Sequence, residues 1–155
     1  MAFFRLALVW CTAIALVAPA TAADPMAEAR QLFSTYVGRL NAFDPTVADL
    51  YADDAKIENT RKYPDGAKST ITVPAPKYKA MLRDAMPRAK QRHDTSTFFS
   101  VDYTQTSDKV RIETTRFTSV KQEAFPLTFV VGAGAGGKWM ILEEYSESRP
   151  ERSEE

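Results

Sequence analysis

The chain has only one cysteine, and it lies near the N-terminus rather than in the body of the sequence. Cys11 belongs to an apolar run, residues 6–18, which follows Arg5 and precedes the small residues of segment 19–22. This order is typical of a secretory signal peptide and predicts cleavage near Ala22 or Ala23. A chain cut there has no cysteine, which excludes disulfides, thiol catalysis and zinc–thiolate sites.

The same apolar run is too short to cross a bilayer, because a transmembrane helix needs about 20 apolar residues. We therefore expect a periplasmic or secreted protein with no membrane span after signal cleavage; an uncleaved anchor is the alternative. Trp10 stands just before Cys11, where a lipoprotein signal has a small residue. Lipidation is therefore not expected.

The chain also lacks an excess of either charge, and it has a single histidine. Loss of Arg5 leaves 19 basic against 20 acidic residues, a balance that argues against a nucleic-acid-binding protein. His93 follows Lys90 and Arg92 in a polar segment, where a solvated position is expected. A lone histidine without cysteine cannot form a strong zinc site, so we expect neither a metal nor a cofactor.

Glycine is scarce too, and four of the six glycines lie within residues 132–137. This segment matches the letters G-x-G-x-x-G of a dinucleotide-binding turn. It leads into residues 138–141, which have the pattern of a strand, whereas the pyrophosphate needs a helix N-terminus at that place. The segment is therefore interpreted as a hairpin loop.

Capping signals and apolar spacing predict three helices. Asp24 and Asp44 are each followed by proline, the usual start of a helix. The first helix carries an apolar stripe to Leu40, and the second is short and ends at residues 53–54. A third helix starts near Pro76, with its apolar residues again at helical spacing.

Alternating apolar residues predict strands, two of them between the second and third helices. The strands are expected over residues 56–61, 69–73, 99–103, 110–120, 125–131 and 139–145. Pro126 has no N–H for a ladder, so its strand needs an edge or a bulge there. The order predicts one α+β domain, residues 23–148, with the helices on one face of a curved sheet. Residues 149–155 are expected to form a disordered acidic tail.

Residues 36–59 resemble the opening of nuclear-transport-factor-2-like proteins, which include ketosteroid isomerases and SnoaL-like polyketide cyclases. The segment joins a helix end that reads Leu40-Asn41-Ala42, a short helix capped by Asp44, and the start of a strand. The resemblance implies a cone-shaped barrel, in which a curved antiparallel sheet packs against three helices around a pocket, and often a homodimer. Because this fold carries enzymes, carriers and binding modules alike, it does not specify a reaction.

The resemblance to ketosteroid isomerases retains one of their three catalytic roles. Tyr36 falls where those enzymes have the tyrosine that donates to the steroid oxyanion. Asn59 stands in place of the general-base aspartate, and an amide has no proton-accepting form near neutral pH. Leu127 lies near the second oxyanion donor, a protonated aspartic acid in those enzymes. Isomerase activity is therefore not expected, and whether the chain is an enzyme stays open.

Polar and aromatic side chains are the candidates for ligand binding. They are Tyr36, Asn59, Tyr103, Arg116, Phe129 and Trp139. Tyr36 is alternatively a core tyrosine, and Asn59 a strand-end cap. Arg116 continues an apolar strand face and needs a partner there; Glu144 is the natural one, either in a structural salt bridge or in a pair that holds a ligand anion.

The final strand is expected to be apolar on both faces. One face carries Trp139, Ile141 and Tyr145. The other carries Met140, Leu142 and Glu144. Since a sheet face in water is normally polar, we expect a second covering, preferably a homodimer through the convex face.

Three functions remain after these arguments. The first is binding of a small, largely apolar ligand in the cone, for which the chain supplies Tyr36, Met81, Phe99, Tyr103, Phe129 and Trp139. The second is a non-catalytic protein-interaction module that acts through the sheet face or the basic third helix, although a solvated helix face also explains those charges. The third is a SnoaL-like lyase, isomerase or cyclase that uses Tyr36 with a carboxylate not yet recognised.

Overall fold

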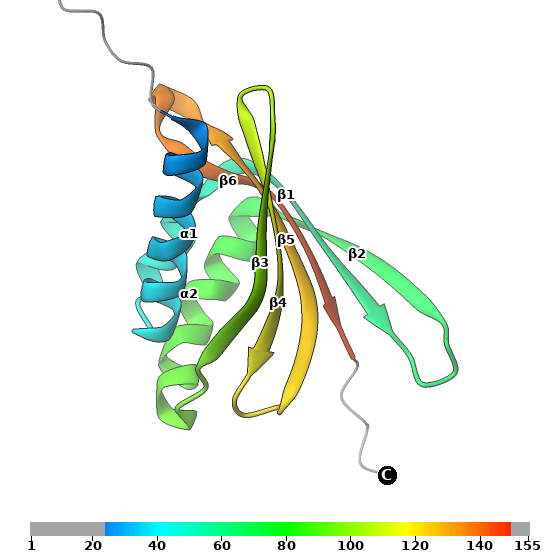
Figure 1. Ribbon diagram of the computed structural model, residues 1–155. Helices are drawn as coiled ribbons and strands as arrows, with labels where there is room; N and C mark the ends of the chain where they lie inside the picture. The colour runs from blue at the N-terminus through cyan, green and yellow to red at the C-terminus, as the bar shows by residue number, and fades with distance from the viewer. Residues whose placement is uncertain (1–23, 150–155) are drawn as a thin grey trace, which may run out of the picture.

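The structure, a computed structural model, describes residues 24–149 (Figure 1). The expected signal peptide and residues 150–155 of the expected tail lie outside this range. In chain order the elements are α1 (Pro25–Asn41), the 3-10 helix η1 (Pro45–Leu50), β1 (Tyr51–Lys62), β2 (Lys68–Pro74), α2 (Ala75–Arg92), β3 (Ser96–Thr106), β4 (Lys109–Thr118), β5 (Glu123–Ala133), the single turn η2 (Ala135–Gly137) and β6 (Trp139–Ser148).

The six strands form one curved sheet in the order β2-β1-β6-β5-β4-β3. Neighbouring strands are antiparallel except β1 and β6, which run parallel. α1 and α2 both lie on the same face of the sheet (Figure 1). The predicted α+β architecture, with helices gathered on one face of a curved sheet, is therefore confirmed.

Both predicted helix starts are confirmed by capping hydrogen bonds. The Asp24 carboxylate accepts from the Met26 amide at 3.1 Å, and the Asp44 carboxylate accepts from the Thr46 amide at 2.8 Å. The predicted end of the second helix at residues 53–54 is wrong, because η1 stops at Leu50 and Tyr51 already belongs to β1. β1 is irregular after Tyr51, where its pairing with β6 shifts register. An irregular strand lacks the strict alternation of side chains from which a strand is predicted.

The alternation predicted for β3 is broken by a bulge. The pairing of β3 with β4 slips between Phe99 and Asp102, and Ser100 has a positive φ of 50°. Phe98 and Tyr103 consequently pack on the core, whereas Phe99 is 50% exposed. Phe99, expected among the aromatic residues of the pocket, therefore lies at the surface.

A second bulge corrects the faces predicted for the final strand. Val131 of β5 pairs with Ile141, but the preceding residue, Val130, pairs with Glu143 rather than with Leu142. The extra residue in β6 places Ile141 and Glu144 on the same, inner face, where both are buried. Simple alternation predicted that Glu144 shares a face with Met140 and Leu142. This prediction is wrong, because Glu144 lies on the face of Ile141.

Pro126 lies where the sheet is locally open. It pairs with Thr115 of β4, but the ladder between β5 and β6 begins only at Leu127 and Ser146. β5 thus has no second neighbour at Pro126, which is the edge that the missing N–H group requires.

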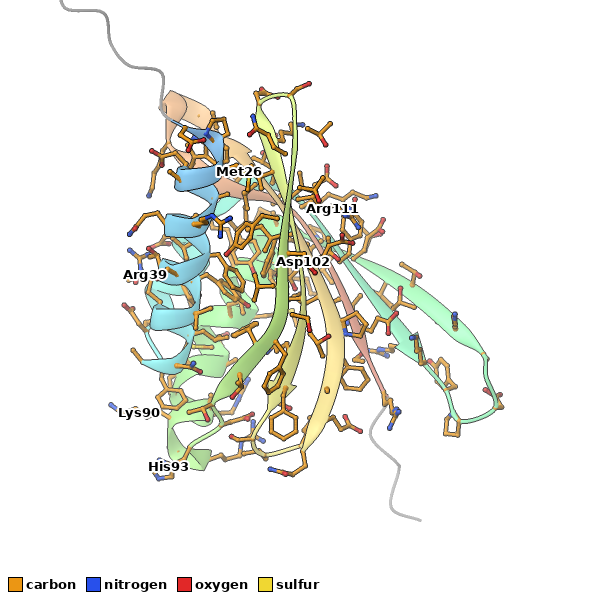
Figure 2. The ribbon with its side chains drawn as sticks, in the orientation of Figure 1. Met26, Arg39, Lys90, His93, Asp102 and Arg111 are labelled. Carbon is orange, nitrogen blue, oxygen red and sulfur yellow. The ribbon has the colours of Figure 1, made fainter. Side chains whose placement is uncertain are left out.

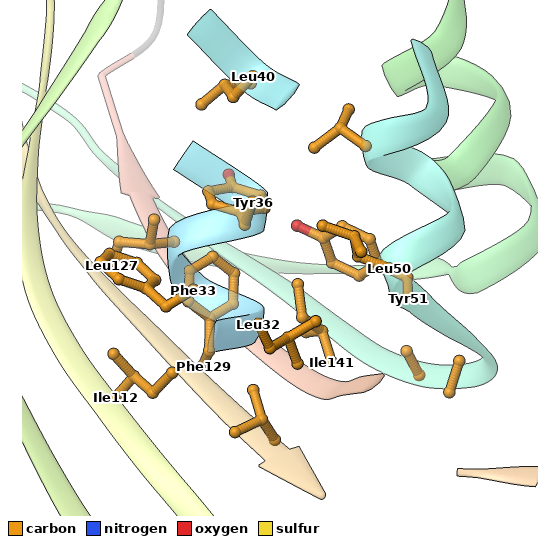
Figure 3. Packing of buried hydrophobic residues seen from close by; sticks show 14 of the residues in the cluster. Leu32, Phe33, Tyr36, Leu40, Leu50, Tyr51, Ile112, Leu127, Phe129 and Ile141 are labelled. Carbon is orange, nitrogen blue, oxygen red and sulfur yellow. The ribbon is translucent and has the colours of Figure 1, made fainter. Parts of the chain in front are cut away.

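Side chains of α1 fill the half of the cone that this helix covers. Leu32, Phe33 and Tyr36 pack against the sheet residues Ile112 and Phe129 (Figure 3). The rings of Tyr36 and Phe129 meet edge to face with centroids 5.0 Å apart. The gap between these side chains is too small for a water molecule, so this half is a packed core.

Candidate functional site

A cavity of about 420 Å³ lies in the other half of the cone, toward the C-terminal ends of β1 and β6. This volume is within the range of small-molecule sites. Apolar walls come from Ile57, Ile71, Val73, Met81 and Leu127. Polar groups come from Asn59, Tyr78, Arg116, Glu144 and Ser146. Further charged residues, among them Arg61, Lys121 and Glu147, complete the lining. The cavity thus combines an apolar wall with polar and charged groups.

Glu144 is the buried acid of this cavity, with 3% of its surface exposed. The hydroxyl of Tyr51 donates to one carboxylate oxygen, and the hydroxyl of Tyr78 donates to the other at 2.8 Å. Burial raises the pKa of Glu144; the two tyrosine hydrogen bonds and the charge of Arg116 oppose this shift without cancelling it. A carboxyl group held in this way can accept or release a proton closer to neutral pH than a surface glutamate.

The tyrosines around Glu144 are proton donors at neutral pH. Burial raises the pKa of Tyr51 and Tyr78 well above the ordinary value, and the Glu144 charge adds to the effect. Burial also raises the pKa of Tyr36 to about 12, although Arg116 lowers it in part. Tyr51 donates its only hydroxyl hydrogen to Glu144.

Arg116 reaches the cavity from β4. The register of β4 against β5 is unbroken, so this side chain stays on the inner face, as its position after Val110 and Ile112 predicted. Its Nε atom donates to the Ser96 hydroxyl at 3.0 Å. Between residues 24 and 149 it forms no ion pair with a carboxylate. The suggested salt bridge with Glu144 is therefore absent, and the two charges act on each other only at longer range.

Asn59 lies in the cavity wall and links two strands. Its amide nitrogen donates to the Ser146 hydroxyl at 3.0 Å, and its oxygen accepts from the Ser148 hydroxyl at 2.8 Å. These bonds tie β1 to β6 along their parallel pairing. Asn59 thus has a structural role that leaves one amide hydrogen for a ligand.

Solved structures with a similar fold come from several bacteria. A protein of unknown function from Pseudomonas putida KT2440 aligns with a TM-score of 0.60 at 16% identity, over 81% of this chain and 88% of that one. A proposed dehydratase from Streptomyces avermitilis aligns with a TM-score of 0.60 at 10% identity, over 78% and 93%. Both are nuclear-transport-factor-2-like proteins.

This chain has the nuclear-transport-factor-2-like fold. A further protein of this fold, from Shewanella oneidensis MR-1, aligns with a TM-score of 0.58 at 12% identity, over 81% of this chain and all of that one. No family profile and no curated protein matches the sequence. At these identities the likeness establishes the fold, and the reaction must be argued from the site.

Within the nuclear-transport-factor-2-like cone, the predicted site residues divide into two groups. Asn59 and Arg116 line the cavity. Tyr36 and Phe129 are buried in the packed half, and Tyr103 and Trp139 are partly buried against that core. The guanidinium of Arg30 lies 4.5 Å above the Tyr103 ring, on the side of the sheet edge rather than in the cavity.

The sequence did not identify the tyrosines that hold Glu144. Tyr51 and Tyr78 fall within the ranges predicted for the second and third helices, and Glu144 is predicted only as a partner of Arg116. The available signal was the pair of adjacent glutamates, Glu143 and Glu144, in a strand whose first four residues are apolar. One of two adjacent strand residues faces inward, and a buried acid needs hydrogen-bond donors. Which donors meet it depends on contacts between residues 51, 78 and 144, which are distant in the chain.

Neither the basic side chains of α2 nor His93 lines the cavity. His93 ends α2 in a left-handed conformation with φ of 51° and is exposed; Lys90 lies near it at the same end of the helix (Figure 2). Lys79 is bound to Asp53 at 2.6 Å, and Arg83 to Asp49 at 2.6 Å. Part of the basic charge therefore fastens α2 to η1 and β1.

Two further searches concern only residues 24–149. No group of three or more histidine, cysteine, aspartate or glutamate residues in this range is placed to hold a metal ion. No helix in this range combines the length and apolar character that crossing a bilayer requires.

Proposed function

We propose that this domain binds a small, largely apolar molecule with one polar end in the cavity between α2 and the concave sheet face. The observation that carries this proposal is the cavity of about 420 Å³, which has apolar walls and the polar groups of Glu144, Tyr78 and Arg116. Ligand sites characteristically combine such walls with a few convergent polar groups. The apolar part would lie along Ile71 and Leu127, and the polar end near Glu144.

A thermal-shift screen of lipophilic and amphipathic compounds tests this function, with native mass spectrometry to give the mass and stoichiometry of any bound molecule. The variant Ile71→Trp fills the cavity from β2 and is expected to lose the stabilisation by ligands. Thr72→Trp adds the same side chain at the next, exposed position and is the matched control. A screen in which no compound raises the melting temperature of the wild-type protein would count against a binding function.

The second candidate function is a lyase or isomerase that moves a proton at Glu144. The observation that favours it is a buried carboxyl group with a raised pKa in the cavity wall, which is the carboxylate that the sequence left unidentified. Tyr78 would orient the carboxyl group and stabilise its charged form. Incubation of a bound ligand in D₂O tests it: Glu144-dependent deuterium at a carbon atom supports catalysis, and unchanged ligand supports binding alone.

A protein-interaction module whose pocket is filled by side chains receives less support, because the cavity is open. The sheet face remains the proposed surface for a second copy. Part of it is polar, since Lys56 pairs with Glu58 at 3.0 Å and Arg111 with Glu113 at 3.2 Å. Light scattering after size-exclusion chromatography tests the homodimer, and a monomer at micromolar concentration would reject it.

Export to the periplasm or medium is part of the proposal. It rests on the signal-peptide pattern of residues 1–22, and the intact mass of the protein recovered from the periplasm tests it. A mass that corresponds to a start near Ala23 is expected. A retained N-terminus would instead support an uncleaved anchor.

A further inference from the structure

Arg116 has most of its hydrogen-bonding capacity unused. A guanidinium carries five N–H donors, and the one hydrogen bond of this side chain within residues 24–149 is from Nε to the Ser96 hydroxyl. The side chain is partly buried and lines the cavity. Arginine in such a position normally pairs with a carboxylate, and here the described part of the chain supplies none in ion-pair contact.

The nearby acid is engaged elsewhere. Tyr51 and Tyr78 each donate to a different oxygen of the Glu144 carboxylate, so both oxygens are already hydrogen-bonded without Arg116. These two tyrosines come from β1 and α2 and hold the acid in place, while Arg116 is held through Ser96 from β3. The fold thus fixes an acid and a cation in one cavity and keeps them out of direct contact.

We propose that Arg116 binds the carboxylate of a small amphipathic monocarboxylic acid, whose apolar part lies on Ile57, Ile71 and Leu127. A guanidinium and a carboxylate match in shape and form two parallel charge-assisted hydrogen bonds. The inference rests on the proposed binding function and names the ligand class for the same cavity. It also assigns the polar end of the ligand to Arg116.

The charge of the site favours a single negative charge on the ligand. Arg116 is the partly buried cation of the cavity, whereas the other basic residues in its lining, Arg61, Lys121 and Arg149, are exposed. Glu144 lines the same cavity. A phosphate monoester brings a charge of about −1.5 to −2 at neutral pH, more than one guanidinium neutralises. A carboxylate brings one charge, and burial raises the pKa of Glu144, which lowers the cost of protonating this acid when a second carboxylate binds in the cavity.

Isothermal titration calorimetry with octanoate and octanamide tests this inference, because the two probes have equal length and differ in charge. We expect the wild-type protein to bind octanoate about tenfold or more tightly than octanamide, the ratio expected of a charge-assisted hydrogen bond. Arg116→Gln is expected to bring this ratio close to one. Arg111→Gln, on the same strand but at an exposed position of the opposite face (Figure 2), is the matched control and should keep it.

A second variant covers the case in which Arg116→Gln does not fold. Arg116→Lys keeps the charge but loses the planar fork, so octanoate binding should weaken while octanamide binding is unchanged. Equal affinity of Arg116→Lys and wild type for octanoate would overturn the inference.

Three outcomes with the wild-type protein separate this inference from the proposed function. Equal binding of octanoate and octanamide overturns the role of Arg116 but leaves a cavity that binds small molecules. A thermal-shift screen that yields only neutral ligands, with no stabilisation by hexanoate, octanoate, decanoate or phenylacetate, also overturns the role of Arg116. It too leaves a cavity that binds small molecules. If no compound of any kind binds, both the inference and the binding function fail.

Discussion

At the scale of single residues, Glu144 illustrates how a buried acid is retained in an apolar sheet. Its two oxygens each receive a tyrosine hydroxyl, so the carboxyl group leaves no buried acceptor without a partner. Such hydrogen bonds stabilise the charged form, but loss of water destabilises it more, and the pKa is raised. The result is a group whose protonation is coupled to folding.

The stability of the protein should therefore depend on pH through Glu144. The folded-state pKa lies above the ordinary value of 4.5, so between the two values the folded state binds more protons than the unfolded state. The free energy of unfolding then falls as pH rises through this window. Glu144→Gln removes the titration, so its melting temperature relative to wild type should increase as the pH rises above 4.5, as differential scanning calorimetry would measure.

The other titratable groups around Glu144 do not change their protonation state in this pH range. Tyr36, Tyr51 and Tyr78 have raised pKa values and stay neutral in this range, and Arg116 stays charged. Glu143→Gln, one residue earlier and outside the core, controls for loss of a carboxylate from the same strand. A difference between Glu144→Gln and wild type that is constant with pH would contradict the assigned cause.

At the scale of secondary-structure elements, two bulges decide which side chains face the interior. In β3 the slip at Ser100 turns Phe98 inward and Phe99 outward. In β6 the extra residue after Ile141 brings Glu144 to the inner face. A one-residue change of register moves a whole run of side chains to the other face, so these two irregularities determine the composition of the core and of the cavity.

The bulge in β3 predicts unequal effects for two adjacent phenylalanines. Phe98→Ala removes edge-to-face contacts with Phe33 and Tyr36, at 5.5 and 6.1 Å between centroids, and should lower the free energy of unfolding by about 2–3 kcal/mol. Phe99→Ala removes a half-exposed ring and should change it by no more than about 0.5 kcal/mol. Urea denaturation of both variants measures this, and equal losses would contradict the inward and outward assignments.

At the scale of the whole molecule, the cone consists of a filled half and an open half. α1 covers the filled half, where Phe33, Tyr36 and Phe129 pack without room for water. α2 covers the open half, where Met81 is 51% exposed at the cavity. We infer that stability comes mainly from the first half and ligand binding from the second.

Two variants separate these contributions. Phe129→Ala leaves a cavity in the packed half and should lower the free energy of unfolding by about 3–5 kcal/mol. Met81→Ala should lower it by no more than about 0.5 kcal/mol, yet weaken the binding of any ligand found for the cavity. Denaturation and calorimetric titration on the same preparations check both statements. A strongly destabilised Met81→Ala protein would mean that the open half is part of the core.

The helix starts, the order of the elements and the fold class can be predicted from the sequence alone. Asp24 and Asp44 cap their helices through bonds to the backbone two residues away, and such local contacts depend on neighbouring residues alone. The inward position of Arg116 also followed, because β4 is regular and alternation suffices in a regular strand.

Which residues form the site depends on tertiary contacts. Tyr51, Tyr78, Arg116 and Glu144 come from four elements, and the alternation predicted for the final strand grouped Glu144 with Met140 and Leu142 rather than with Ile141. Its true position follows from how β6 pairs with β5, and its donors follow from how α2 and β1 pack on the sheet. Pairing between strands and packing between layers join residues far apart in the chain, so no local pattern records them.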